Sequence, residues 1–258
     1  MRSRYDPAMT LRRLRRQWDV LGKTDPFWAV LTADDKRGSR WSVEEFFATG
    51  EQEIDEVATY VESLGVELDH GRALDFGCGP GRLTQALADR FEAVWGVDIA
   101  PSMIEQADRH DRHSGKCHYR VNERPDLKMF ESESFGFIYS AIVLQHIEPR
   151  YQRAYIREFV RVLAPGGVLV FQLPSEPIPG RSALWVRLKP IIKSITRGPL
   201  LSAYRRVRWG RGTNTEMWGM PKEDVITLLE EAGATILDVR VDASAGRSWA
   251  GFRYAVRK

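Results

Sequence analysis

Hydrophobic residues recur at two different spacings along this chain of 258 residues, and the change of spacing separates two regions. In residues 1–70 the apolar positions mainly follow the spacing of helices. Helices are expected around residues 10–21 and 51–64, with Gly65 as the stop of the second, and a Trp- and Phe-rich loop is expected over residues 27–47. Residues 1–70 are therefore predicted to form a helical N-terminal arm.

From residue 71 onward, short apolar runs alternate with helical patterns. Strands that alternate with helices indicate a parallel sheet covered by helices. The amphipathic segment 151–163 is expected to be one of these covering helices. The expected strands are residues 72–76, 93–97, 118–121, 135–139 and 167–173.

The pattern changes again near the end of the chain. Residues 221–232 predict a last covering helix, which stops at Gly233. Two alternating runs, 235–241 and 249–256, predict an antiparallel hairpin. The predicted fold class is therefore α/β, with a Rossmann-like, doubly wound sheet of seven strands that ends in a C-terminal antiparallel hairpin, in a domain spanning residues 71–258.

Three alternating glycines follow the first expected strand. Gly77, Gly79 and Gly81 have no Cβ, so they can adopt unusual backbone angles and let a ligand lie against the backbone at the carboxyl end of the strand. Asp98 follows the next strand, and its carboxylate can accept two hydrogen bonds from a ribose diol. The pattern predicts a nucleotide-containing ligand, although a simple tight turn would use the same glycines.

NAD is one candidate for this ligand, because NAD-binding folds also place an acidic residue about 20 residues after the glycines. Their fingerprint needs a small residue at the sixth position counted from Gly77, where this chain has Arg82. The Arg82 side chain is expected to obstruct the close contact between helix and strand that a third glycine permits. An NAD-linked or noncatalytic nucleotide-binding protein is therefore the second interpretation.

Four sequence blocks resemble the class I S-adenosylmethionine (SAM) dependent methyltransferases. Residues 74–81, LDFGCGPG, resemble the first motif of this family, and residues 96–103, GVDIAPSM, resemble its second motif. Residues 134–147 resemble the region of the fourth strand, and residues 161–170 resemble the turn that enters the fifth strand. The resemblance covers residues 70–173 and points to the type 11/12-like enzymes of the bacterial small-molecule branch.

The resemblance implies SAM as the cofactor and assigns its parts to particular residues. The methionine end would lie near Asp75, Asp98 would hold the ribose, and Ile99 would pack on the adenine. Asn122 or Glu123 lies where such enzymes commonly place an adenine-contacting residue, but their usual Gly-Asp pair is missing there, and Gly136 replaces a frequent aspartate in the fourth strand. The implied cofactor-binding residues are Asp75, Gly77, Cys78, Gly79, Gly81, Asp98, Ile99, Asn122, Ser140 and Ala141.

Methyl transfer from a sulfonium is an in-line displacement, so alignment of the reactants can supply much of the catalysis. A hydroxyl acceptor must also lose its proton, and His146, just after the fourth expected strand, is the candidate base, with Glu148 as a secondary candidate. A structural role for His146 is the alternative. The chain lacks the Asn/Asp-Pro-Pro-aromatic signature of enzymes that methylate exocyclic base nitrogens. The expected acceptor is a small molecule or a glycan- or lipid-linked compound, methylated at oxygen, and an RNA methyltransferase is an alternative.

Charge adds a further expectation about the acceptor. The net charge is only +3, but residues 1–16 contain six arginines and one acid, and residues 177–215 contain nine basic residues and no acid. Residues 174–218 are expected to form a basic lid that recruits an anionic or amphipathic acceptor or makes peripheral contact with a membrane, with an ordinary solvated helix face as the alternative. No nucleic-acid module accompanies the basic residues, so nucleic acid is not an expected partner.

The remaining features indicate a globular cytoplasmic protein. The chain is 43% hydrophobic, has only two cysteines, and lacks an apolar run of membrane-spanning length. No metal-ligand motif is present, so no metal is expected. The aromatic residues Trp28, Trp41, Phe46 and Phe47 are expected either to cap the cofactor or to pack beneath the sheet.

Overall fold

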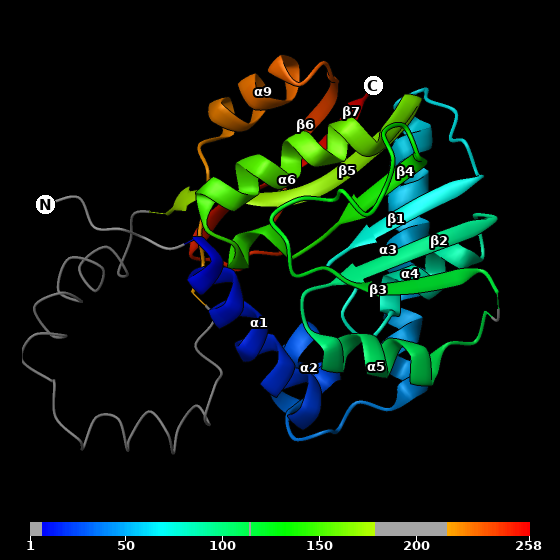
Figure 1. Cartoon of the computed structure of the whole chain (residues 1–258), viewed down its shortest axis with the longest axis vertical. Helices are drawn as coiled ribbons and strands as arrows, with labels where there is room; N and C mark the ends of the chain where they lie inside the picture. Colours follow the sequence, from blue (N-terminus) through cyan, green and yellow to red (C-terminus); the bar gives the residue numbers. More distant parts are fainter. Residues whose placement is uncertain (1–6, 114, 179–215) are drawn as a thin grey trace, which may run out of the picture.

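The computed structural model describes residues 7–113, 115–178 and 216–258. These residues build one mixed sheet of seven strands with helices on both faces (Figure 1). In chain order, the elements are α1 (Pro7–Thr24), α2 (Pro26–Val30), η1 (Asp34–Lys36), α3 (Val43–Ser63), β1 (Arg72–Phe76), α4 (Arg82–Ala88), β2 (Ala93–Asp98), α5 (Pro101–His110), β3 (Cys117–Val121), β4 (Phe135–Ser140), η2 (Leu144–His146), α6 (Pro149–Val162), β5 (Leu163–Pro177), α9 (Lys222–Glu231), β6 (Thr235–Val241) and β7 (Trp249–Arg257).

The strand order across the sheet is β3-β2-β1-β4-β5-β7-β6. Strands β1 to β5 pair in parallel, whereas β7 pairs antiparallel with both β5 and β6. β1 lies between β2 and β4, so the strand order changes direction at its carboxyl end, which is where open α/β sheets bind ligands. This order confirms the predicted doubly wound sheet and its antiparallel end.

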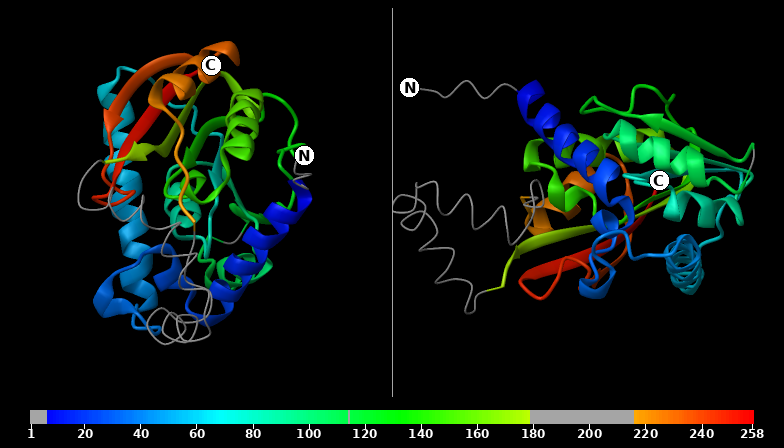
Figure 2. Two further views of the ribbon diagram at one scale, coloured as in Figure 1. Left: turned by 90° about the vertical axis from the view of Figure 1, so that its left-hand side faces the viewer. Right: turned by 90° about the horizontal axis from the view of Figure 1, so that it is seen from below.

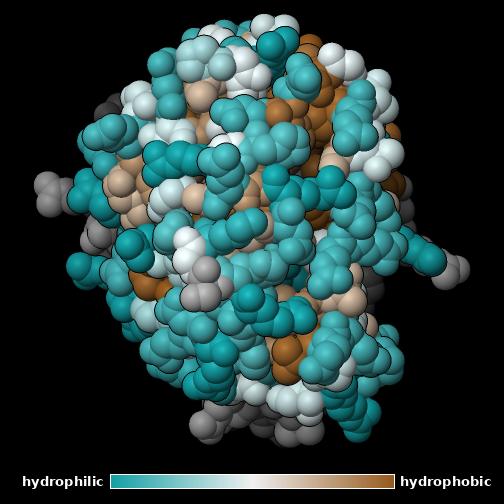
Figure 3. Space-filling model, turned by 90° about the vertical axis from the view of Figure 1, so that its right-hand side faces the viewer, coloured by the Kyte–Doolittle hydropathy of each residue, from teal (hydrophilic) through white to brown (hydrophobic). Residues whose placement is uncertain are grey.

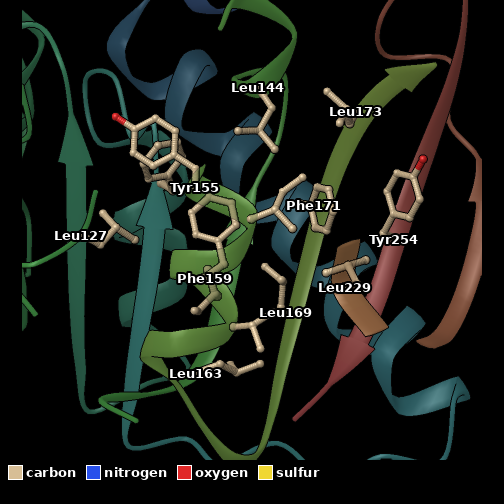
Figure 4. Close-up of a cluster of buried hydrophobic side chains, with 14 of the residues drawn as sticks. Leu127, Leu144, Tyr155, Phe159, Leu163, Leu169, Phe171, Leu173, Leu229 and Tyr254 are labelled. Atoms are coloured by element: carbon tan, nitrogen blue, oxygen red, sulfur yellow. The ribbon is translucent and has the colours of Figure 1, made fainter. Parts of the chain in front are cut away.

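Each face of the sheet is covered by its own apolar layer. Helices α6 and α9 cover one face, where Phe159, Phe171, Leu229 and Tyr254 pack together (Figure 4). Helices α3 and α4 cover the other face. The rings of Phe171 and Tyr254 are stacked, with centroids 4.9 Å apart. Full burial of one large apolar side chain contributes about 1.5–3 kcal/mol, so these layers hold the strand ends in place.

Residues 27–47 are not the loop that the sequence predicted, because they contain α2, η1 and the first turn of α3. α3 begins early because Ser42 and Glu45 form a capping box. The Ser42 side chain accepts a hydrogen bond from the Glu45 N–H at 3.1 Å, and Glu45 Oε2 accepts one from the Ser42 N–H at 3.3 Å. Phe46 and Phe47 therefore lie on the buried face of a helix.

The N-terminal arm is fastened to the start of α5. Asp19 Oδ1 accepts a hydrogen bond of 3.1 Å from the Ser102 N–H, and the Ser102 hydroxyl donates one of 2.9 Å to the Asp19 carbonyl. Gly22 permits this approach, since a Cβ there would overlap the Ser102 side chain. Leu21 and Met103 pack together beside these bonds. α1 and α2 consequently lie on the side toward which β1, β2 and β3 point (Figures 1 and 2).

The opposite side of the molecule shows mostly hydrophilic residues, with hydrophobic ones in separate areas (Figure 3). None of the helices in the described ranges is long and apolar enough to cross a membrane. Most of the predicted basic lid, residues 179–215, lies outside the described residues, as do residues 1–6.

Candidate functional site

The glycine loop after β1 has the backbone that its sequence predicted. Gly77, Gly79 and Gly81 have φ angles of 82°, 51° and 87°, in the left-handed region that favours glycine. A Cβ on Gly77 would overlap the side chain of Val143. The N–H groups of Gly77 and Cys78 both donate to the Val97 carbonyl, at 2.7 and 3.0 Å, and so fix the loop against the end of β2.

Asp98 is the last residue of β2 and is held by backbone N–H groups. Its Oδ2 accepts a hydrogen bond of 3.0 Å from Gly79, and its Oδ1 accepts one of 2.8 Å from Ala100. Burial raises the pKa of Asp98 to about 6, while these two hydrogen bonds act in the opposite direction. The carboxylate is therefore fixed in position at the carboxyl end of β2.

A cavity with an empty volume of about 980 Å³ lies over the glycine loop, and we call it the loop cavity. Its wall brings together residues from the ends of β1, β2, β3 and β4. The candidate base His146 and seven of the implied cofactor-binding residues line it: Gly77, Cys78, Gly79, Asp98, Ile99, Asn122 and Ala141.

Three of the ten implied cofactor-binding residues, Asp75, Gly81 and Ser140, do not line the loop cavity, and neither does the secondary base candidate Glu148. The side chain of Asp75 is buried and accepts a hydrogen bond of 2.6 Å from the Thr84 hydroxyl, and burial raises its pKa to about 7. The Ser140 hydroxyl donates to the Phe76 carbonyl at 3.0 Å. Both side chains are engaged with neighbouring elements.

The wall of the loop cavity also contains residues that the motifs did not indicate. Leu11, Leu14 and Trp18 come from α1, and Ala29 and Val30 come from α2. Leu11, Leu14 and Trp18 have the spacing of one helix face, so the sequence indicates an apolar stripe on α1. The sequence does not indicate which part of the protein this stripe packs against.

A second cavity adjoins the first, with an empty volume of about 1500 Å³, and we call it the tryptophan cavity. It is lined by Trp18, Trp28 and Trp41, whereas Phe46 and Phe47 are not in its wall. The residues that line both cavities, called the shared wall below, are Trp18, Ala29, Val30, Arg82, Ile142 and His146.

Two residues of the shared wall follow β4. Ile142 has a φ angle of 61°, which is a strained conformation for a β-branched residue. His146 lies in η2, with its ring edge-on to Trp18 at a centroid distance of 5.4 Å. The Nδ1 atom of His146 is 3.4 Å from the Glu216 carbonyl, and its Nε2 atom is 3.3 Å from Nε2 of Gln145.

Burial lowers the pKa of His146 to about 4, so the imidazole is neutral at pH 7. Its contacts fit a ring in which Nδ1 donates to Glu216 and Nε2 accepts from the Gln145 amide. Burial also raises the pKa of the Cys78 thiol, which makes it a poor nucleophile. No group of three or more potential metal ligands occurs among the described residues.

The chain is similar to known methyltransferases both in sequence and in fold. Residues 74–171 match the model of a family described as a methyltransferase domain. The ubiquinone biosynthesis O-methyltransferase of Xanthomonas euvesicatoria pv. vesicatoria (strain 85-10) is 34% identical over 108 residues, which are 42% of this chain and 44% of that protein. The chain thus matches less than half the length of this curated relative.

Solved structures resemble the chain over a greater length. The magnesium protoporphyrin IX methyltransferase of Synechocystis PCC 6803 with bound SAH aligns with 96% of this chain and 99% of its own, with a TM-score of 0.64 at 15% identity. A SAM-dependent methyltransferase of Methanosarcina mazei covers 74% of this chain and 94% of its own, with a TM-score of 0.54 at 24% identity. These similarities establish a shared fold.

Proposed function

We propose, from the premise that this chain carries a class I SAM-dependent methyltransferase domain, that it transfers a methyl group from SAM to an oxygen atom of a small-molecule acceptor. The observation that carries this proposal is the pair of cavities: one lies over the glycine loop and Asp98, and the other adjoins it through the shared wall. A two-substrate reaction needs both ligands in adjacent sites.

The loop cavity fits SAM. It lies at the carboxyl ends of β1 and β2, which is where open α/β sheets bind ligands. Glycine is needed at position 79, since a Cβ there would lie 3.0 Å from the Val30 side chain, and the absence of side chains at Gly77 and Gly79 leaves the loop backbone uncovered on the cavity wall. The solved structures of related fold include one with bound SAM and one with bound SAH, and these support SAM over the NAD alternative.

Particular residues are proposed to hold each part of the cofactor. The backbone of Gly77 and Gly79 would accommodate the methionine end, Asp98 would accept hydrogen bonds from the ribose hydroxyls, and Ile99 and Asn122 would contact the adenine. Bound SAM supplies an electrophilic methyl group on a sulfonium, which becomes a neutral thioether when the acceptor oxygen takes the methyl and releases its proton.

His146 is proposed to contact the acceptor hydroxyl. Because its ring is neutral at pH 7, Nε2 of His146 can accept a hydrogen bond from the acceptor hydroxyl when the Gln145 amide no longer donates to this atom. Its low pKa makes it a weak base, so we propose that it orients the hydroxyl and receives the proton late in the transfer. Methylation at oxygen is supported by the name of the curated relative.

The RNA alternative and the proposed membrane contact depend on the basic segments. Residues 1–6 and 179–215 contain many of those charges and lie outside the described residues, so neither proposal gains support from the fold.

Two measurements test the proposed function together. Calorimetry should detect stoichiometric binding of SAH to the full chain, and incubation with ¹³C-methyl SAM and fractionated metabolites should label a small molecule. The ¹³C chemical shift of the transferred methyl then distinguishes oxygen from nitrogen and carbon. Binding of NAD but not of SAH would overturn the proposal, and an N-methyl product would overturn its assignment to oxygen.

A further inference from the structure

We infer that the tryptophan cavity binds the methyl acceptor and selects an uncharged aromatic ring that carries a hydroxyl group. The inference rests on the proposed function, since it names the acceptor of the same site. The tryptophan cavity meets the loop cavity at Trp18, Ile142 and His146, but it is not lined by the glycine loop or Asp98. It is therefore placed to hold a second ligand beside the first.

Two of the tryptophans that line this cavity, Trp28 and Trp41, have no free indole N–H. Trp28 donates its indole N–H to the Ala33 carbonyl at 3.0 Å, and Trp41 donates to the Leu31 carbonyl at 3.2 Å. Flat aromatic surfaces of this kind favour another flat ring, through stacked or edge-on contacts.

Two cations already cover these indoles, and neither cation lines the cavity. The guanidinium of Arg37 lies 5.0 Å from the centroid of Trp28, and the Lys36 ammonium lies 5.1 Å from that of Trp41. The indoles therefore already make cation–π contacts from within the protein, which lowers the attraction they offer to a cationic ligand.

The charges in the wall of the tryptophan cavity are paired with each other. Arg82, which is only 4% exposed, forms an ion pair of 2.6 Å with Glu53. The other oxygen of Glu53 accepts a hydrogen bond of 2.9 Å from the Tyr139 hydroxyl. A charged acceptor would lose its water without gaining a free counter-charge here, so the wall favours an uncharged ligand.

Two buried polar atoms in this wall have no hydrogen-bond partner within the described part of the chain. They are Oε1 of Gln145, which can only accept, and Nε of Arg82, which can only donate. Gln145 is 4% exposed. Because buried polar atoms are normally paired, these two atoms point to a ligand group that both donates and accepts, as an aromatic hydroxyl does. Its single proton would lie toward Oε1 of Gln145 in the bound state and turn to Nε2 of His146 only for the transfer.

Binding measurements on the SAH-saturated full chain test the ligand class with three probes. We expect 2-naphthol to bind, and we expect 2-naphthoate and the saturated analogue decahydro-2-naphthol to bind at least tenfold more weakly. Gln145→Met should raise the Kd of 2-naphthol about two- to tenfold, the effect of one lost hydrogen bond. Gln172→Met is the matched control, because Gln172 is also buried with an unpartnered amide but lines neither cavity.

The Glu53→Gln variant tests the charge argument in the opposite direction. The amide can still accept from Tyr139 but leaves the Arg82 charge without its counter-ion, so 2-naphthoate should gain affinity while 2-naphthol does not. Trp41→Leu should weaken 2-naphthol, whereas Trp95→Leu, outside both cavities, should not.

The inference is overturned if wild-type protein that binds SAH prefers 2-naphthoate or fails to bind 2-naphthol. It is also overturned if Gln145→Met and Gln172→Met have equal effects. A chain that binds no SAH contradicts the proposed function instead, so the two failures are distinguishable.

Discussion

The backbone N–H of Gly79 donates a hydrogen bond of 3.0 Å to Oδ2 of Asp98, and this bond ties the glycine loop after β1 to the carboxylate that ends β2. The two parts of the motif, 19 residues apart, therefore form a single structural unit. Since one oxygen of Asp98 accepts from the loop and the other accepts from Ala100, the carboxylate is held in a fixed orientation in the wall of the loop cavity.

Replacement of Asp98 by alanine is expected to weaken SAH binding by about 1.5–3 kcal/mol, the usual range for hydrogen bonds to a charged group. Calorimetry on the folded variant measures this loss. Asp238→Ala, a carboxylate of the edge strand β6, is the control and should leave the affinity unchanged. Equal SAH affinity in Asp98→Ala and wild type would remove Asp98 from the ribose site.

The affinity for SAH should also fall as the pH drops through about 6. The raised pKa of Asp98 means that its carboxyl becomes protonated in this range and loses acceptor capacity. Titrations at pH 5 and pH 8 should show weaker binding at pH 5 in the wild type and a smaller difference in Asp98→Asn. If Asp98→Asn keeps the full pH dependence, another group is responsible.

His146 should not produce an inflection near pH 6.5 in the turnover profile, because burial lowers its pKa to about 4. His146→Ala should reduce kcat on the identified acceptor more than it reduces SAH affinity. A positioned base is typically worth about 10²–10⁴-fold. A loss of less than threefold in kcat would mean that His146 serves only to pack against Trp18.

Trp18 is expected to support the cofactor through its ring, since it belongs to the wall of both cavities. Trp18→Ala should weaken SAH binding by about 0.5–1.5 kcal/mol, the size of a typical aromatic contact. Val20→Ala on the same helix is the control, because Val20 is 44% exposed and lines neither cavity. Similar effects in both variants would indicate general damage to α1.

Asp75 should make folding less favourable as the pH rises. Its pKa in the folded chain is about 7, above its unfolded value near 3.9, so the folded state holds the proton more tightly and stability decreases between about pH 4 and pH 7. Asp75→Asn removes this dependence. Denaturant unfolding should therefore show that the unfolding free energy of Asp75→Asn, relative to that of the wild type, is larger at pH 8 than at pH 4. The reverse order would contradict the raised pKa of Asp75.

Gly136 is required by the close approach of Asp69, whose Cβ and carbonyl oxygen would lie 2.8 Å from an added Cβ. Gly136→Ala should cost about 1–3 kcal/mol of stability, as overpacking does. Gly71→Ala is the control, since its nearest contact is a side-chain oxygen at 3.2 Å. Denaturant unfolding measures the unfolding free energies of the two variants. Equal values would show that the loop at Asp69 can move away from an added Cβ at position 136 at little cost.

The sequence predicted the strands well because their apolar runs are short and bounded by turn residues. It predicted β5 too short, however, since the pairing of β7 with β5 continues to Pro177 opposite Trp249. No local pattern reports such a pairing between distant segments. The start of α3 was missed for another reason, because the aromatic residues around Ser42 obscured a capping signal that was present.

The site was predictable wherever one motif held all of the required residues. The position of the glycine loop beside Asp98 could be predicted, because each follows a strand that the local pattern indicates. The tryptophan cavity could not be assigned, since it joins α1, α2, α3, η2 and the turn before β7. Nor could the pairing of Glu53 with Arg82 be read from residues 29 positions apart.

The shared wall also has a thermodynamic consequence. Trp18 and Ile142 face both cavities, so a ligand in one cavity alters the surface that a ligand in the other cavity contacts. Two ligands in that relation have a coupling free energy, and linkage requires it to be the same whichever binds first. If SAM and its acceptor occupy the two cavities as proposed, any effect of the cofactor on the affinity of the acceptor must be matched by an equal effect of the acceptor on the affinity of the cofactor, and the same holds for the two products.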